Sequence, residues 1–404
     1  MVAAYTISIP DERLAAIQSR VAGFDWRQLP DVGGWSAGVG VEDLKRLVAY
    51  WKDNYDWRDV ERRLNQLPNF TTEIEGERMH FLHKKGNGSK APVLLLHGWP
   101  GSYLEFKHLL DPLSADGHDV IVPSLPGFAF STPITGVIGP RRAGELMHGL
   151  MERLSGKTRY IVQGGDWGAN IASWMAFDRP DALLGFHVNS VHIFPKDAAP
   201  ISAEEKDWFA RRAAILDWET GYSHEQETRP QTLGVAMSDS PVGAAAWILE
   251  KFGKWADLPK RADGSPDVWS RFSEEELLTN IMLYLVPSSV VTATWIYHGM
   301  RLESSQRFPA GTRVRPPMGV AAFPDPVFLF TPRSFVERIY NVVRWTDMTK
   351  GGHFAALEEP ELMLADLRAF ITTVSESSNE TAAGRSSGFQ PAERMVKSAI
   401  TESS

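Results

Sequence analysis

The segment GGDWG, residues 164–168, is the strongest chemical signal in the chain. It directly follows the apolar run Tyr160–Gln163, and a helical pattern begins immediately after it. Small residues on both sides of a reactive one at a strand-to-helix junction are typical of a nucleophile elbow, because glycine permits the sharp turn. The reactive residue is usually serine, but here it is Asp166, and a carboxylate can displace at an sp³ carbon to form an alkyl ester. The motif predicts covalent catalysis by Asp166, with an ordinary helix-capping turn as the alternative interpretation.

The segment HGWPGS, residues 97–102, follows a second apolar run at Val93–Leu96. A loop in this position supplies one backbone N–H of an oxyanion hole, and the residue after the nucleophile supplies the other. Trp99 and Trp167 are therefore the predicted oxyanion-hole residues, which would stabilise the charge formed when water attacks the alkyl ester. We expect His97 to support the loop rather than to transfer protons.

A late histidine completes the pattern. Of the 11 histidines, His353 alone lies in a glycine-rich turn after the last expected strand, in GGHF at residues 351–354. Its place after the nucleophile predicts that it deprotonates the hydrolytic water. Such a base needs a carboxylate to orient it. Asp325, in FPDP at residues 323–326, is the first candidate, and Glu303 is the second; a simple Asp-Pro turn is the other interpretation of Asp325.

From about residue 79, short apolar runs alternate with helical stretches. This alternation favours a mostly parallel, twisted sheet whose strands are joined by helical crossovers, which is an α/β fold. The expected strands are Met79–His83, Val93–His97, Val120–Pro123, Tyr160–Gln163, Leu184–Asn189, Arg315–Ala321 and Val342–Met348.

The alternation stops between residues 195 and 305, where the pattern is almost purely helical. A helical insert between strands predicts a lid over a site at the strand C-termini. Ser202 and Glu205 have the spacing of a capping box, which opens a helix reaching about Thr220; further helices are expected at 244–256 and 274–285. The predicted organisation is an N-terminal meander at 1–75, a core at 76–194 and 306–375, a lid at 195–305, and a polar, mostly disordered tail at 376–404.

Composition excludes several classes of function. The 404 residues carry a net charge of −8 without a long run of one sign, which argues against a nucleic-acid partner. The absence of cysteine excludes disulfides, thiolate nucleophiles and cysteine-based metal sites. We see no signal peptide and no apolar stretch of about 18 residues, so a cytoplasmic protein without a membrane anchor is expected. No metal or organic cofactor is needed, because side chains and backbone amides supply every required group. The oligomeric state stays open, with a homodimer as one alternative.

Taken in order, these motifs resemble the microsomal-type epoxide hydrolases of the α/β-hydrolase superfamily, over roughly residues 5–372. The resemblance implies an aspartate nucleophile, a histidine paired with an acid, and two lid tyrosines that protonate the epoxide oxygen. Tyr222 and Tyr297 stand at the matching positions. The matching segments are FDWRQLP at 24–30, HGWPGS at 97–102, PSLPGFAFS at 123–131, GGDWG at 164–168, DSPVGAAAWILEKF at 239–252 and GGHFAALEEPELM at 351–363.

The function predicted from these residues is hydrolysis of an epoxide to a vicinal diol. Lid tryptophans such as Trp208 and Trp255 suggest an apolar or aryl epoxide. One alternative is a haloalkane dehalogenase, which also uses an elbow aspartate and for which Trp167 would suit halide binding. The tyrosine pair favours the epoxide, because two phenol O–H groups can stabilise and protonate an alkoxide. A non-catalytic binding protein on the same scaffold is the third interpretation, although a pure binder would need none of these groups.

Overall fold

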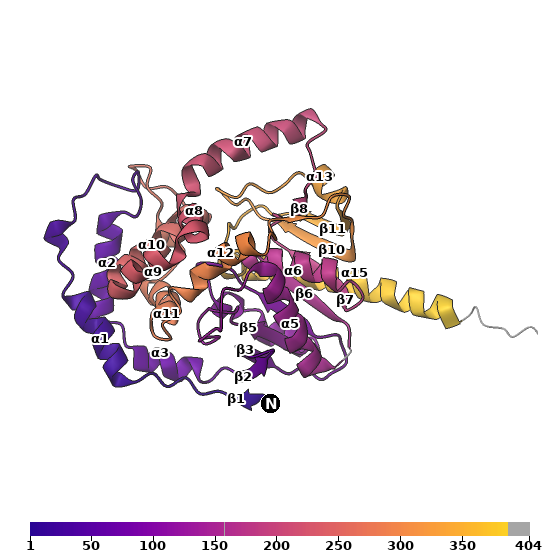
Figure 1. Ribbon diagram of the computed structural model, residues 1–404, viewed down its shortest axis with the longest axis horizontal. Helices are drawn as coiled ribbons and strands as arrows, with labels where there is room; N and C mark the ends of the chain where they lie inside the picture. Colours follow the sequence, from indigo (N-terminus) through magenta and orange to yellow (C-terminus); the bar gives the residue numbers. More distant parts are fainter. Residues whose placement is uncertain (157, 387–404) are drawn as a thin grey trace, which may run out of the picture.

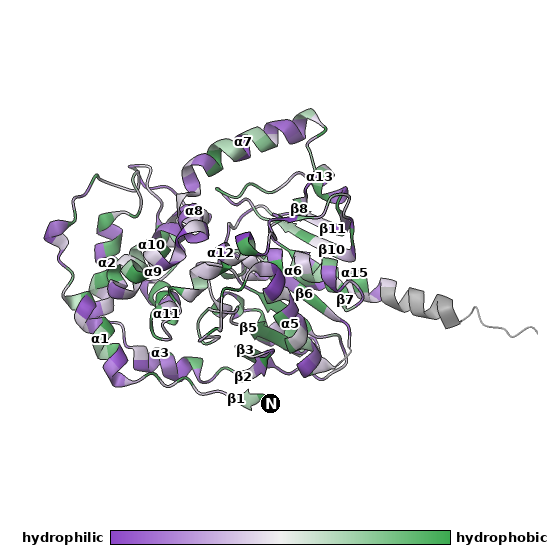
Figure 2. Ribbon diagram, viewed as in Figure 1, coloured by the Kyte–Doolittle hydropathy of each residue, from purple (hydrophilic) through white to green (hydrophobic). Residues whose placement is uncertain are grey.

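A nine-stranded sheet forms the centre of the computed structural model, which describes residues 1–156 and 158–386. The strand order is β1-β2-β3-β5-β4-β6-β7-β10-β11, and the strands from β5 to β11 are all parallel (Figure 1). Figure 2 shows apolar residues concentrated on these strands, as expected when helices cover both faces of a sheet. The predicted α/β class is confirmed, and each of the seven predicted strands is present with ends shifted by no more than two residues.

The strands have the following bounds. The main sheet contains β1 (Ala3–Ala4), β2 (Asn69–Ile74), β3 (Glu77–Lys84), β4 (Val93–Leu96), β5 (Val120–Pro123), β6 (Tyr160–Gly164), β7 (Leu183–Val188), β10 (Val314–Ala322) and β11 (Tyr340–Asp347), and a separate parallel pair contains β8 (Phe194–Pro195) and β9 (Arg307–Phe308).

The N-terminal edge of the sheet is antiparallel, which the sequence analysis did not predict. Strands β2 and β3 form a hairpin through Glu75 and Gly76, whose φ angles are 50° and 85°. Two successive residues with positive φ make a turn that matches the twist of a tight hairpin, and so short a connection joins only antiparallel strands. Strand β3 then pairs antiparallel with β5, so the parallel part of the sheet begins at β5.

Helices cover both faces of the sheet. Helices α5 (Pro140–Ser155) and α6 (Trp167–Asp178) pack on one face, and α4 (Leu110–Ala115) and α15 (Pro360–Ser386) on the other, where Arg368 binds Asp116. Two short helices, α13 (Arg333–Glu337) and α14 (Ala355–Glu358), flank β11. Helix α15 includes residues 376–386, which the sequence analysis assigned to the polar tail; the rest of that tail lies outside the described residues.

The predicted lid contains more helices than the sequence indicated. Ser202 begins α7 by accepting a hydrogen bond from the Glu205 N–H, but the Glu205 carboxylate binds the N–H of Ile201 rather than closing a capping box on Ser202. Figure 1 shows α7 crossing above the rest of the lid. The lid helices are α7 (Ala203–Glu219), α8 (Gly221–Thr228), α9 (Pro230–Asp239), α10 (Pro241–Trp255), α11 (Glu274–Leu285) and α12 (Trp295–Leu302).

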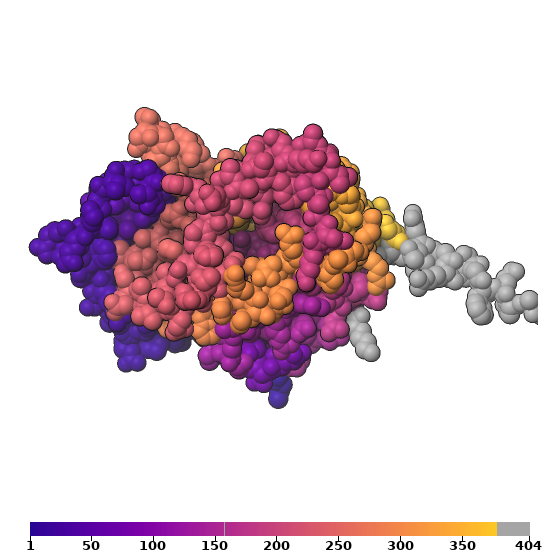
Figure 3. Space-filling view, turned by 45° about the horizontal axis from the view of Figure 1, so that its top comes forward, coloured from indigo at the N-terminus to yellow at the C-terminus, as the bar shows by residue number. Residues whose placement is uncertain are grey.

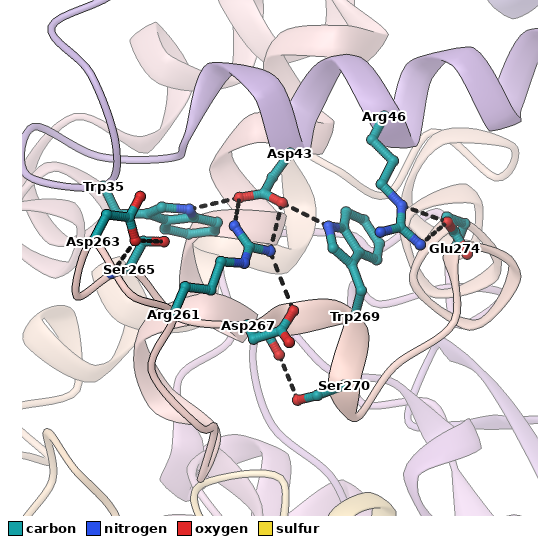
Figure 4. A network of polar contacts seen from close by, with 10 residues as sticks. All are labelled: Trp35, Asp43, Arg46, Arg261, Asp263, Ser265, Asp267, Trp269, Ser270 and Glu274. Carbon is teal, nitrogen blue, oxygen red and sulfur yellow. Dashed lines mark hydrogen bonds and ion pairs between the residues drawn. The ribbon is translucent and has the colours of Figure 1, made fainter.

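The N-terminal helices pack against the lid rather than against the sheet. Helices α1 (Asp11–Ala22) and α2 (Val41–Asp53) contact α10, and α2 also contacts α11 (Figure 1); α3 (Trp57–Leu64) follows α2 directly. Asp43 on α2 is nearly buried and accepts two hydrogen bonds from Arg261 and one from each of the Trp35 and Trp269 indoles, at 2.6–2.8 Å (Figure 4). Burial would raise the pKa of Asp43, but these donors lower it below its usual value, so the carboxylate stays ionised. This network fastens the loop between α10 and α11 to the N-terminal segment.

Candidate active site

Asp166 lies at the turn between β6 and α6, in a backbone conformation that few residues adopt. Its φ is 49° and its ψ is −122°, which carries strain for a residue other than glycine. The turn is tight because the helix start presses on β4: a β-carbon at Gly168 would lie 1.9 Å from the Leu96 carbonyl oxygen. The backbone N–H of Asp166 donates to Ser190 Oγ at 3.1 Å. The turn therefore has the geometry of a nucleophile elbow that presents the carboxylate at the C-terminal edge of the sheet.

The loop after β4 holds one oxygen of this carboxylate. The Trp99 N–H donates to Asp166 Oδ1 at 2.8 Å, and the Trp167 N–H also contributes. A β-carbon at Gly98 would lie 2.2 Å from the same oxygen, so glycine is required for the loop to come this close. His97 is buried, pairs through Nδ1 with the Gly98 carbonyl and accepts the Leu125 N–H at Nε2. These bonds suit the loop-supporting role expected for His97.

The second oxygen of the carboxylate faces His353. Nε2 of His353 lies 3.5 Å from Asp166 Oδ2, and its Nδ1 lies 2.8 Å from Asp325 Oδ2. The other oxygen of Asp325 accepts the N–H groups of Val327 and Phe328, both at 2.8 Å, which fixes the carboxylate in place. The Asp325 carboxylate, the buried His353 imidazole and the Asp166 carboxylate are thus aligned in one row.

Glu303, the second candidate for the orienting acid, lies elsewhere. Its carboxylate accepts the N–H of Gly139 at 2.7 Å and that of Arg141 at 3.1 Å, at the start of α5. It caps that helix, where a negative charge is favourable. Of the two candidates, only Asp325 contacts His353.

The charges of these three residues shift the pKa values of Asp166 and His353. Burial would raise the pKa of Asp166, but the hydrogen bonding and charge of His353, followed by the N–H groups of Trp99 and Trp167, lower it below its usual value. Burial would likewise lower the pKa of His353, yet Asp166 and Asp325 raise it to about 10. Asp166 is therefore an ionised carboxylate paired with the His353 imidazolium.

Tyr222 and Tyr297 meet above the nucleophile because α8 and α12 are in contact. Tyr222 stacks on Trp99 at 5.3 Å, Tyr297 meets Trp167 edge-on at 4.5 Å, and the two phenol rings are 6.0 Å apart between centroids. Burial raises the pKa of both phenols well above their usual range, so both keep their protons. In the described part of the chain, the buried Tyr297 hydroxyl makes no hydrogen bond of normal geometry. The hydroxyl lies close to that of Tyr222 and to the Trp167 indole, so the two phenols can act on one ligand atom.

Sequence reasoning missed Glu358, which shapes the histidine loop. Its buried carboxylate accepts the N–H groups of Gly352 and Phe354, the two neighbours of His353, at 2.9 Å each. It also accepts the N–H of Asp257 at the end of α10, at 2.7 Å. Burial raises the pKa of Glu358 to about 7. Its spacing of five residues after His353 was the available signal, but a loop-binding role is not readable from a single acidic residue.

Sequence reasoning also missed Glu105, on the short helix η2 (Tyr103–Phe106) behind the oxyanion loop. A β-carbon at Gly101 would lie 1.6 Å from Glu105 Oε1, so the glycine leaves the space that this carboxyl group fills. Burial raises the pKa of Glu105 to about 8, and the charges of His353 and Asp166 both act on it. It is a titratable group next to the catalytic pair.

The elbow after β6, the histidine on the loop after β11 and the helical lid together define an α/β-hydrolase. The family described as "alpha/beta hydrolase fold" matches residues 91–224, and the family described as "Epoxide hydrolase N terminus" matches residues 2–106.

Individual relatives extend the match to most of the chain. A protein from Stigmatella aurantiaca is 38% identical over 378 residues, covering 90% of this chain and 83% of the relative. Epoxide hydrolase 1 from Sus scrofa is 33% identical over 404 residues, covering 91% of this chain and 88% of the relative. The solved structure of Aspergillus niger epoxide hydrolase has a TM-score of 0.79 at 32% identity, covering 93% of this chain and 97% of that one. The chain belongs to the epoxide hydrolase family, whose members are hydrolases, and the predicted resemblance is confirmed. In residues 1–156 and 158–386, no helix combines the length and apolarity needed to cross a bilayer.

Proposed function

We propose that the chain hydrolyses an epoxide in two steps through an ester on Asp166. The observation that carries this proposal is that the two oxygens of the Asp166 carboxylate have different contacts. Oδ1 accepts the Trp99 N–H, while Oδ2 faces His353. Oδ2 attacks a ring carbon, the carbon–oxygen bond of the ring breaks, and the phenols of Tyr222 and Tyr297 stabilise the new alkoxide and protonate it.

Loss of the carboxylate charge prepares the second step. Once Asp166 is an ester, one of the two carboxylates that hold the proton on His353 has lost its charge, so the pKa of His353 falls toward its ordinary value of about 6.5. The released proton restores the phenol, and neutral His353 then deprotonates a water molecule. Hydroxide adds to the ester carbon, and the oxyanion at Oδ1 is held by the N–H groups of Trp99 and Trp167. Collapse of this intermediate transfers the remaining proton to the diol and regenerates the ion pair.

Product analysis tests the reaction class. The protein incubated with styrene oxide should form the vicinal diol, and with a haloalkane it should release no halide. Halide release without diol formation would replace this proposal with dehalogenation.

Removal of the two phenols tests their role. Each of Tyr222→Phe and Tyr297→Phe should lower the rate of ester formation by about 10- to 100-fold, because the alkoxide keeps one donor. The double variant should lose about 10³-fold or more. The rate is measured in a single turnover with excess enzyme, and Tyr50→Phe, a partly buried tyrosine on α2, serves as the control. Unchanged ester formation in the double variant would remove both tyrosines from the mechanism.

Three sequence predictions stand beside this proposal as proposals of their own. They are an apolar or aryl epoxide as substrate, the cytoplasm as the location, and an open oligomeric state for which a homodimer is one alternative. Ring contacts of Trp255 with His353 at 4.8 Å and with Tyr222 at 5.2 Å support an apolar ring binding near the nucleophile.

A further inference from the structure

Arg212 lies among apolar side chains on helix α7, on the face of the helix that points toward the rest of the protein. The less exposed positions of α7 recur every three or four residues, which marks one face of the helix. Arg212 lies in the middle of this face, and its neighbour Arg211 points outward and pairs with Asp207. Figure 3 shows a hollow in the surface below α7, with the orange segment that contains α12 on its other side. The less exposed positions are Glu205, Trp208, Phe209, Arg212, Ile215, Leu216 and Glu219.

Arg212 has no carboxylate partner in the described part of the chain. Its guanidinium lies 5.7 Å from the centre of the Trp208 ring, and burial lowers its pKa, with a further contribution from the charge of Arg307. Two acids lie on the same face: Glu205 is already bound by Arg338 and by Ser334 Oγ, and Glu219 forms no ion pair with Arg212. A partly desolvated guanidinium without a counter-charge is unfavourable in the absence of a ligand.

A second donor on this face also lacks a partner. Trp208 is only 4% exposed, and its indole N–H is buried without a hydrogen-bond acceptor in the described residues. Buried polar groups are nearly always satisfied in folded proteins, so an unsatisfied one calls for an explanation. The buried Trp208 N–H and the neighbouring Arg212 guanidinium could therefore donate to one acceptor, which the described residues do not supply.

His192 connects Arg212 with the catalytic residues. The charges of Arg212, Asp166, His353 and Asp325 all act on this imidazole, and burial is the main reason that its pKa falls to about 4. The His192 ring packs on Phe328 at 6.0 Å, and Phe328 packs on His353 at 5.3 Å. Arg212 and the Asp166–His353 pair are therefore both within electrostatic range of His192.

We infer that Arg212, with the Trp208 indole beside it, binds an anionic group of the substrate, and that the natural substrates are epoxides carrying a carboxylate at the end remote from the ring. This inference rests on the proposed function and adds a charged end to the apolar body expected for the substrate. A guanidinium suits a carboxylate because it offers paired N–H donors in one plane.

Matched substrates test the inference. Terminal epoxides that carry a carboxylate at the other end of an alkyl chain, in a series of increasing chain length, are compared with their methyl esters and with styrene oxide. The wild-type protein should show a higher kcat/KM for the acid than for its ester at one or more chain lengths. Arg212→Gln should lower kcat/KM for those acids by about 10- to 100-fold, the range of a hydrogen bond to a charged group, and leave the esters and styrene oxide within about twofold. Arg212→Lys should retain part of the preference.

Arg211→Gln is the matched control, because it removes the same charge one position away on the outer face of α7. It should leave the preference for acids unchanged. Equal kcat/KM for acid and ester at every chain length in the wild type would overturn the inference. So would an equal loss for acids and esters in Arg212→Gln, since Arg212 would then only support Trp208. Absence of diol from styrene oxide and from all other epoxides would overturn the proposed function itself, and this inference with it.

Discussion

Asp166→Asn is expected to abolish diol formation, with kcat lowered by about 10⁴-fold or more, while the protein stays folded. The amide has no charged oxygen to attack a ring carbon, so no ester forms and both steps are lost together. Asparagine is the suitable replacement because it keeps the shape of the side chain and tolerates the positive φ of 49° at this turn better than alanine does. The measurements are steady-state diol formation and, by mass spectrometry, the absence of an adduct after incubation with excess epoxide.

Stability provides the second readout for Asp166→Asn. The Asp166 carboxylate pairs with the His353 imidazolium, and its pKa is lowered in the folded protein, so its loss should lower the thermal unfolding temperature while the protein stays folded. Asp181→Asn is the control, since this carboxylate is 95% exposed and makes only a 3.8 Å pair with Arg315. Turnover by Asp166→Asn at more than a few per cent of the wild-type rate would place the nucleophile elsewhere.

His353→Gln is expected to form the ester but not to hydrolyse it. The nucleophile itself does not need the imidazole as a base, whereas the hydrolytic water does. One equivalent of epoxide should therefore be consumed, and the peptide containing Asp166 should gain the mass of the substrate. Steady-state turnover should fall by about 10³-fold or more.

The pH dependence of this variant separates the two steps. Because Asp166 loses the imidazolium that lowers its pKa, ester formation in His353→Gln should decline at a higher pH than in the wild type as the solution is acidified. His108→Gln, at an exposed histidine, is the control and should behave as the wild type. Full turnover without an accumulating ester would show that another group activates the water.

The parts of the site that the sequence predicted are those whose chemistry lies in a short segment. The elbow at Asp166 and the glycine-rich turn at His353 each depend on neighbours within a few residues, so their types and spacing carry the information. The partner of His353 was harder to predict, because Glu303 at the end of the lid and Asp325 after it both sit next to turns. The choice depends on which loop reaches the end of β11, and this is a property of the assembled sheet.

The helices and strands, like the site residues, were predicted only where a short segment carries a clear pattern. Strands β4 and β5 were predicted because each is a continuous apolar run, which is typical of a strand covered on both faces. The segment Asn69–Ile74 mixes polar and apolar residues because it lies near the edge of the sheet, and it was assigned to the N-terminal segment instead. Helices α8 and α9 are short and are separated only by Arg229, so their periodicity is too brief to recognise. Arg212 was overlooked because an arginine on a helix is ordinarily solvated.

The contacts of Asp43 have a consequence for recombining this chain with its relatives. The N-terminal helices and the loop that carries Arg261 and Trp269 share one nearly buried carboxylate, although more than two hundred residues separate them in the sequence. A chimera that exchanges either segment alone risks leaving Asp43 without its guanidinium, at a cost on the order of 3 kcal/mol. A chimera should therefore take residues 1–75 and the lid loop from the same parent, because the two segments share the contacts of Asp43 and must be inherited together.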